Sequence, residues 1–209
     1  MEPFGRLVAV AAPIEIPKID TGMILPGRYM RRHRRPGHDY SEAFLHDLRF
    51  DEHENPRPDF PLNMPAFQNA RILVTDVDFG CGSSREGAAY AVLDFGVRAL
   101  IGPNFGDIFH LNLMQNGILP VQLPYDAVHT LWRQLRDKPG SEVAIDLPEQ
   151  IVIAPGGERF SFDISAARKD RLIHGVDDID LTLRHENAIQ TFEAARRKNR
   201  PWLPQLPNV

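Results

Sequence analysis

The hydrophobic residues that precede Val143 fall into short runs separated by polar turns, which is the pattern of buried strands and their connecting helices. Apolar runs predict strands at residues 7–12, 71–75, 97–102 and 118–123, the first of them ending at Pro13. Good helix formers predict helices at residues 88–93, 108–116 and 125–136. Because strand, helix and strand follow one another within about thirty residues, we expect a right-handed βαβ unit with parallel strands.

From Val143 the pattern changes to alternation, which is typical of strands with one buried face. It predicts three short strands at residues 143–147, 151–153 and 160–162, with a hairpin turn at residues 155–158. Helical spacing then predicts helices at residues 163–175 and 179–197. The end of the domain is therefore expected to be helical.

The chain between the first two strands is less regular. Residues 28–39 are basic and predict an exposed loop, whereas Phe44, Leu45 and Leu48 predict a short amphipathic helix over residues 40–50. Residues 55–65 contain four prolines and are expected to cross irregularly to the next strand.

The junction between the strand at 71–75 and its helix carries the candidate chemistry, Gly80-Cys81-Gly82-Ser83-Ser84-Arg85. The glycines permit positive φ, and the serines stand where exposed helix N–H groups favour an anion. The guanidinium of Arg85 can hold a carboxylate through two hydrogen bonds. The pattern predicts a carboxylate-binding turn, although a tight turn with a serine N-cap fits the spacing equally well. Nucleotide binding is not expected, because both the dinucleotide and the P-loop glycine patterns are missing.

Composition excludes several classes of protein. The 209 residues suit one domain with an extension, and the net charge of −4 gives no reason to expect nucleic acid. A local basic cluster is expected to be a solvated loop, Arg28, Arg31, Arg32, Arg34 and Arg35. The sequence contains neither an apolar run of the ~20 residues that cross a bilayer nor a convincing signal peptide. We therefore expect a cytoplasmic protein that does not bind membranes.

The single cysteine, Cys81, limits the metal chemistry of the chain. One cysteine excludes an internal disulfide and a multi-cysteine metal site, and the eight histidines lack ligand spacing. We expect Cys81 to pack rather than to ligate. Any iron–sulfur cluster would have to come from another chain.

Several separated stretches resemble the small subunit of 3-isopropylmalate dehydratase, itself similar to the swivelling domain of aconitase. They are Asp20-Thr21, Ile24–Tyr29, Asp78–Glu86, Asp94-Phe95-Gly96, Pro103–Phe109 and Asn116–Pro120. The resemblance implies an α/β fold, a three-layer β/β/α swivelling domain of the aconitase domain-4 type. We expect one such domain over residues 1–209, with a core of about 1–165 and a C-terminal helical extension of about 166–209.

The resemblance also implies half of an enzyme. In this family a large subunit holds a [4Fe-4S] cluster, and the two subunits form a heterodimer or heterotetramer. The substrate is a small hydroxy-dicarboxylate, 2-isopropylmalate. Its hydroxyl moves from C2 to C3 by dehydration and rehydration, a step of leucine biosynthesis.

Site roles follow by position. Ser83 matches the serine that acts as alkoxide base, Ser84 a neighbour that hydrogen-bonds substrate, and Arg85 the arginine that holds a substrate carboxylate. The residues agree with this, since helix-end N–H groups and Arg85 could stabilise a serine alkoxide. Further substrate-binding positions are expected at Asp20, Thr21, Tyr29 and Arg31.

Two positions depart from the family pattern. Gly87 stands where relatives usually have histidine, and Gly22 where they usually have aspartate. A paralogous hydro-lyase for homoaconitate, 2-methylmalate or dimethylmalate, a non-catalytic regulatory subunit and a free-standing carboxylate-binding module therefore stay open. Arg31 could bind an additional substrate carboxylate or point to solvent.

Overall fold

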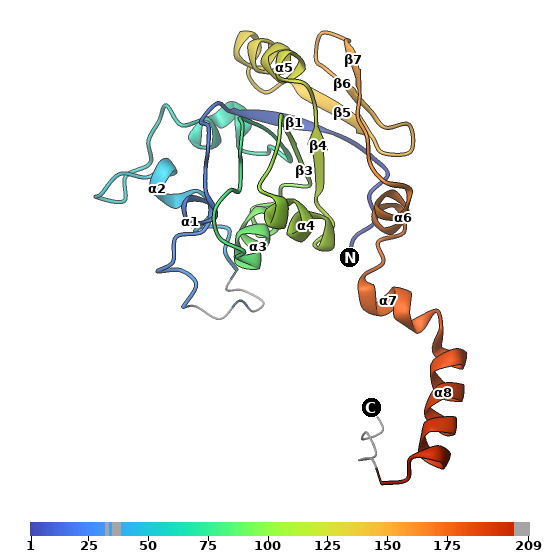
Figure 1. Ribbon diagram of the computed structural model, residues 1–209. Helices are drawn as coiled ribbons and strands as arrows, with labels where there is room; N and C mark the ends of the chain where they lie inside the picture. Colours follow the sequence, from blue (N-terminus) through green and yellow to red (C-terminus); the bar gives the residue numbers. More distant parts are fainter. Residues whose placement is uncertain (32–33, 35–38, 203–209) are drawn as a thin grey trace. The chain divides into compact units, whose positions relative to one another are not determined.

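The computed structural model describes residues 1–31, 34 and 39–202 (Figure 1). The chain forms two compact units, Met1–Gly175 and Val176–Val209. Helix α6 (Ala166–His174), which the sequence places in the extension, belongs to the first unit, where Leu172 is buried. The boundary follows Gly175, which has a left-handed φ of 65° and ends this helix.

In the described part of the first unit, seven strands form one sheet in the order β4-β3-β2-β1-β5-β6-β7. The strands are β1 (Arg6–Ile14), β2 (Ile72–Thr75), β3 (Ala99–Gly102), β4 (Leu119–Gln122), β5 (Glu142–Asp146), β6 (Ile151–Ile153) and β7 (Arg159–Ser161). Neighbours from β1 to β4 are parallel, and those from β1 through β5 and β6 to β7 are antiparallel. The predicted parallel βαβ unit and the C-terminal strands are confirmed.

Strand β1 belongs to both parts of the sheet. Its first half, Arg6–Val10, pairs with β5, whereas Ala11–Ile14 pair with β2. The prediction that Pro13 ends the strand is wrong, because Pro13 lies opposite Val74 inside the β2 pairing. Proline is tolerated here because β5 no longer pairs with this end of β1, so the missing N–H leaves no ladder bond unmade on that side.

Successive residues of β2 face opposite cores, as alternation along a strand requires. Ile72 and Val74 belong to a cluster with α5 (Tyr125–Asp137) and with β5 and β6, and Leu73 belongs to a cluster with α3 (Glu86–Asp94). Figure 1 shows α5 on one side of these strands and α3 with α4 (Asp107–Gln115) on the other. The strand is therefore buried on both faces.

The segment between β1 and β2 is more broken than the sequence predicts. It contains α1 (Thr21–Ile24), α2 (His46–Arg49) and two short 3₁₀ turns, η1 (Pro61–Asn63) and η2 (Pro65–Phe67). The expected helix over residues 40–50 is wrong in its first half, because Leu45 has a left-handed φ of 51°. A helix cannot pass through that conformation, so α2 begins only at His46.

The second unit consists, where described, of α7 (Asp178–Leu183) and α8 (Glu186–Asn199). The sequence predicts one helix over residues 179–197, whereas the structure has two, interrupted at Arg184 and His185. Helix α7 begins with a capping box in which Asp177 and Asp180 bond each other's backbone N–H. Within the described residues, no helix is both long and apolar enough to cross a bilayer.

Two turns at the carboxyl ends of β2 and β3 touch through their backbones. Gly106 N–H donates to the Phe79 carbonyl at 3.0 Å, and a Cβ on Gly106 would overlap the carbonyl oxygen of Gly80. Gly80 itself has φ +75°, and an added Cβ there would overlap the ring of Phe109. Asp78 and Asn104 join the same turns, with Asp78 N–H donating to Asn104 Oδ1 at 2.9 Å. Glycine is therefore required by contact at both Gly80 and Gly106, and by φ as well at Gly80.

We expect Gly106→Ala to lower the free energy of unfolding by about 1–3 kcal/mol, because its methyl group has no space beside the Gly80 backbone. Gly5→Ala is the matched control, since an added Cβ at Gly5 meets nothing within 4 Å. Urea unfolding followed by circular dichroism measures both. Equal urea midpoints for Gly106→Ala and Gly5→Ala would show that the two turns can move apart without loss of stability.

Candidate functional site

The polar side chains of the turn from Gly80 to Arg85 take no part in holding the turn together. Ser83 and Ser84 are exposed, and neither caps α3, whose N-cap is Arg85 and has no side-chain cap bond. Among the described residues, the two hydroxyls and the Arg85 guanidinium have no hydrogen-bond or ion-pair partner. The alternative of a serine N-cap is therefore wrong, and these groups are available to a ligand.

Helix α1 holds this turn from one side. Gly80 N–H donates to the Ile19 carbonyl at 2.7 Å, and Thr21 N–H to the Cys81 carbonyl at 3.0 Å. The Thr21 hydroxyl donates to the Ser83 carbonyl at 3.3 Å, and only 1% of Thr21 is exposed. The buried threonine thus positions the backbone that carries Ser83. Its expected contact with substrate stays a prediction.

Asp20 is the N-cap of α1. Its Oδ1 accepts from the N–H groups of Gly22 at 2.6 Å and Met23 at 2.8 Å. This carboxylate oxygen satisfies two of the helix's orphan donors, so Asp20 fixes the start of α1. As with Thr21, a contact between Asp20 and substrate stays a prediction.

The departure at Gly22 lies beside Arg85. A Cβ on Gly22 would stand 3.0 Å from Asp20 Oδ1 and 3.6 Å from Arg85 Nη1. The Arg85 guanidinium therefore lies next to the first turn of α1, where a larger side chain would crowd it. Glycine leaves this side of Arg85 open.

The departure at Gly87 lies in the first turn of α3 and is covered by apolar side chains. A Cβ here would meet Leu25 Cδ2 at 3.0 Å and Met30 Cε at 4.0 Å. Leu25 is fully buried, whereas 42% of Met30 is exposed. An apolar wall thus lies over the start of α3, one turn from Ser84. Sequence reasoning missed this wall, because a glycine gives no signal of what packs on it.

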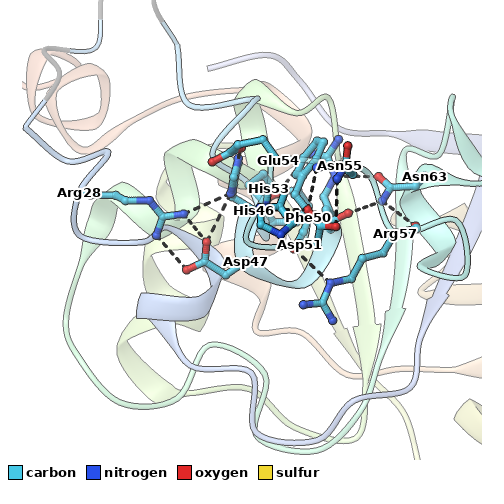
Figure 2. Close-up of polar contacts among 12 residues, drawn as sticks. Arg28, His46, Asp47, Phe50, Asp51, His53, Glu54, Asn55, Arg57 and Asn63 are labelled. Atoms are coloured by element: carbon cyan, nitrogen blue, oxygen red, sulfur yellow. Dashed lines mark hydrogen bonds and ion pairs between the residues drawn. The ribbon is translucent and has the colours of Figure 1, made fainter.

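The segment carrying Tyr29 and Arg31 begins with a turn in which Tyr29 N–H donates to the Pro26 carbonyl at 2.9 Å. Arg28 extends from it to Asp47 and His46 of α2 (Figure 2). Arg31 is exposed and has no partner among the described residues. Arg32, from the same expected loop, and Arg35 lie outside the described residues.

Two arginines of the basic cluster form ion pairs instead of being simply solvated. Arg28 bonds Asp47, and Arg34 bonds both oxygens of Asp94 on α3, at 2.7–3.2 Å. The Arg28 guanidinium holds the pKa of Asp47 below its ordinary value, and Asp94 raises the pKa of Arg34. Arg34 also lies over the Tyr90 ring, 4.6 Å from its centroid. The sequence showed the cations, but their acidic partners are distant in the chain.

Metal ligands do not gather in the described part of the chain. No group of three or more His, Cys, Asp or Glu side chains there could hold a metal ion. Cys81, which is partly buried, directs its thiol toward the Lys18 carbonyl at 3.8 Å. The site therefore offers hydroxyl and guanidinium groups as its chemistry.

Comparison with known proteins adds the family. The profile of the Aconitase C-terminal domain matches residues 1–126, and LeuD_N matches residues 129–166. The C-terminal domain of the 3-isopropylmalate dehydratase small subunit matches residues 178–205. The 3-isopropylmalate dehydratase small subunit of Parvibaculum lavamentivorans is 42% identical over 203 residues, 97% of this chain and 100% of that protein. Its counterpart in Rhodospirillum centenum is 43% identical over 202 residues, 97% of this chain and 98% of that protein.

The fold is also similar to that of a solved 3-isopropylmalate dehydratase structure. A crystal structure of 3-isopropylmalate dehydratase from Methanocaldococcus jannaschii superimposes with a TM-score of 0.63, covering 90% of this chain and 99% of that chain at 22% identity. This likeness supports the fold alone, and the expected α/β architecture of the aconitase type is confirmed. Together with the identity to curated relatives over nearly the whole chain, it shows that the protein belongs to the 3-isopropylmalate dehydratase small-subunit family.

Proposed function

We propose that this chain acts in the cytoplasm as the base-bearing small subunit of a 3-isopropylmalate dehydratase in leucine biosynthesis. With a large subunit, as a heterodimer or heterotetramer, it isomerises 2-isopropylmalate to 3-isopropylmalate. The observation that carries the proposal is the turn at Ser83, Ser84 and Arg85. It is fixed from behind by Thr21 and Gly106, while its own hydroxyls and guanidinium stay unpaired among the described residues.

Ser83 is the base in this proposal. As its alkoxide it takes a proton from the carbon beside the one that bears the hydroxyl, and the C–O bond breaks to give an alkene. The hydroxide takes up one proton and departs as water, and an equivalent proton is released when water adds in the second half of the reaction. The proton then returns to the carbon that lost the hydroxyl, while water supplies a hydroxyl to its neighbour. Because a serine normally keeps its proton, the alkoxide needs the N–H groups at the start of α3 and the charge of Arg85.

Arg85 and Ser84 orient the substrate. The guanidinium binds one carboxylate through two N–H groups, and the Ser84 hydroxyl hydrogen-bonds the substrate. A [4Fe-4S] cluster, when bound, supplies a Lewis acid for the substrate hydroxyl and the other carboxylate. The described residues contain no ligand set for it, so we place the cluster on the large subunit.

The segment from Tyr29 to Arg31 is proposed to receive the substrate side chain. Met30, which packs over Gly87 and is 42% exposed, offers an apolar surface that suits an isopropyl group, with the buried Leu25 beneath it. Arg31 supports a second candidate, a paralogue for homoaconitate, because its exposed guanidinium could bind an extra carboxylate. We favour 2-isopropylmalate, since the apolar contact is built into the structure.

The first test is anaerobic turnover of 2-isopropylmalate, followed by alkene absorbance, with this chain mixed with a cluster-loaded large subunit. We expect activity in the mixture and none with either subunit alone. Homoaconitate, 2-methylmalate and dimethylmalate are assayed in parallel. If 2-isopropylmalate is not turned over but another acid is, the assignment moves to that acid. If none of the four acids is turned over although the complex forms, a regulatory subunit is favoured.

We expect Ser83→Ala to lower kcat by about 10²–10⁴-fold, the usual contribution of a positioned base, while the subunits still associate. Ser165→Ala is the matched control, because Ser165 is an exposed serine before α6 whose side chain makes no cap bond. Turnover is measured with the assembled complex, and association by size-exclusion chromatography. Unchanged turnover in Ser83→Ala would reject the assignment of the base.

Arg85→Gln should lower kcat/KM by about 10- to 100-fold, because a charge-assisted pair with the substrate carboxylate is lost. Arg85→Lys keeps the charge but lacks the planar fork, so its kcat/KM should lie between that of Arg85→Gln and that of the wild type. Arg133→Gln on α5, which removes an exposed arginine from another helix, should leave kcat/KM unchanged. Equal kinetics of Arg85→Gln and the wild type would show that Arg85 does not hold substrate.

A further inference from the structure

The segment that follows α1 is held from behind by α2. Arg28 donates from Nη1 to Asp47 Oδ2 at 2.9 Å and from Nη2 to Asp47 Oδ1, so the guanidinium and carboxylate form a two-bond pair (Figure 2). The backbone supports the same contact, since Leu45 N–H donates to the Ile24 carbonyl at the end of α1 at 3.0 Å. The direction in which the chain leaves α1 is therefore set by side chains that lie 18 and 19 positions beyond Arg28.

His46 forms the buried floor of this pair. Only 7% of His46 is exposed, and its ring lies 5.1 Å from the Tyr29 ring and 4.7 Å from the Phe50 ring, centroid to centroid. Its Nδ1 lies 3.2 Å from Arg28 Nη2, and its Nε2 lies 2.9 Å from Glu54 Oε2. Nδ1 also lies 3.3 Å from Asp47 Oδ1, so the ring contacts both members of the ion pair.

Tyr29 and Met30, the two residues after Arg28, connect the ion pair to the candidate site. The Arg28 guanidinium stacks over the Tyr29 ring at 4.7 Å, and Met30 Cε is the atom that lies over Gly87. A displacement of Arg28 would move Tyr29 and Met30 away from the start of α3. The ion pair thus sets the distance between the proposed side-chain surface and the turn that carries Ser83.

Stability does not explain this arrangement. The side chains of Arg28 and Asp47 are 51% and 54% exposed, and exposed ion pairs contribute little to folding. Arg28 holds the pKa of Asp47 below its ordinary value, so the carboxylate stays charged at neutral pH. The pair instead fixes geometry, because two parallel hydrogen bonds set the angle between the Arg28 guanidinium and the Asp47 carboxylate.

We propose that Arg28 and Asp47, on the His46 floor, are positioning residues for substrate selection, which hold Tyr29–Arg31 against the start of α3 without touching substrate. The proposal rests on the proposed function for the identity of the substrate, but not for the contact itself. It assigns specificity to side chains outside the segment that faces the ligand.

The kinetic test uses Asp47→Asn, Arg28→Gln and the double variant in the assembled complex, with 2-isopropylmalate and 2-methylmalate as substrates. We expect each single variant to raise KM for 2-isopropylmalate about fivefold, the scale of an exposed pair, with kcat within about twofold. The KM for 2-methylmalate should rise less, because its methyl group is smaller than isopropyl. The preference for 2-isopropylmalate over 2-methylmalate therefore falls. The double variant should be no worse than either single one.

Two further variants separate positioning from loss of structure. The reversed pair, Arg28→Asp with Asp47→Arg, restores attraction and should recover part of the preference. Glu158→Gln, an exposed carboxylate-to-amide change at the hairpin between β6 and β7, should change nothing. Additive effects in the double variant, an equal loss on both acids, or unchanged kinetics in Asp47→Asn would each overturn the proposal.

Hydrogen exchange of the isolated chain tests the contact without any activity. Asp47→Asn should speed exchange of the Tyr29 and Met30 amides, which donate to Pro26 and Gly27 carbonyls at 2.9 and 3.3 Å, while amides of α5 stay unchanged. Equal exchange at Tyr29 and Met30 would overturn the proposal whatever the kinetics show. If the wild-type complex acts on another acid instead, the proposed function fails, and the same variants are then compared on that acid.

Discussion

The close approach of two glycines is the constraint on which the candidate site depends. Gly106 packs against the carbonyl of Gly80, and Phe109 lies directly under Gly80, so neither position has space for a side chain. The turn after β2 is thereby supported by the turn after β3, in a region where parallel strands end together. Ser83 follows this fixed backbone, and its exposure is a consequence of where the backbone lies.

Around that backbone, the polar groups divide into those that build the site and those that remain for a ligand. Asp20 and Thr21 bond main-chain groups of α1 and of the turn. Ser83, Ser84 and Arg85 bond nothing through their side chains in the described part of the chain. This division favours a site completed by another molecule, which agrees with a family of small subunits.

The two departures from the family pattern are both explained by packing. Gly22 leaves the flank of Arg85 open, and Gly87 is covered by Leu25 and Met30. Neither glycine disturbs the turn that carries Ser83. The changes therefore alter the surface around the proposed substrate while leaving the proposed base in place, which favours a working enzyme over a purely regulatory subunit.

The sequence alone determined what depends on neighbours in the chain. Short apolar runs identified β2, β3 and β4, alternation identified the last three strands, and the Gly-Cys-Gly-Ser-Ser-Arg string identified both the family and the turn. These signals are local, because strand periodicity and glycine turns act over a few residues. The parts of the site that follow directly from the turn were accordingly predictable.

Only the tertiary structure decided the rest, because those features join residues that are distant in sequence. Leu45 adopts a left-handed φ and shortens the expected helix, and Pro13 continues β1 because β5 has ended. The pairing of Arg28 with Asp47 and the covering of Gly87 by Met30 also span many positions. Which cation meets which acid, and which side chain fills a glycine's space, is set by packing of the whole unit and not by local propensity.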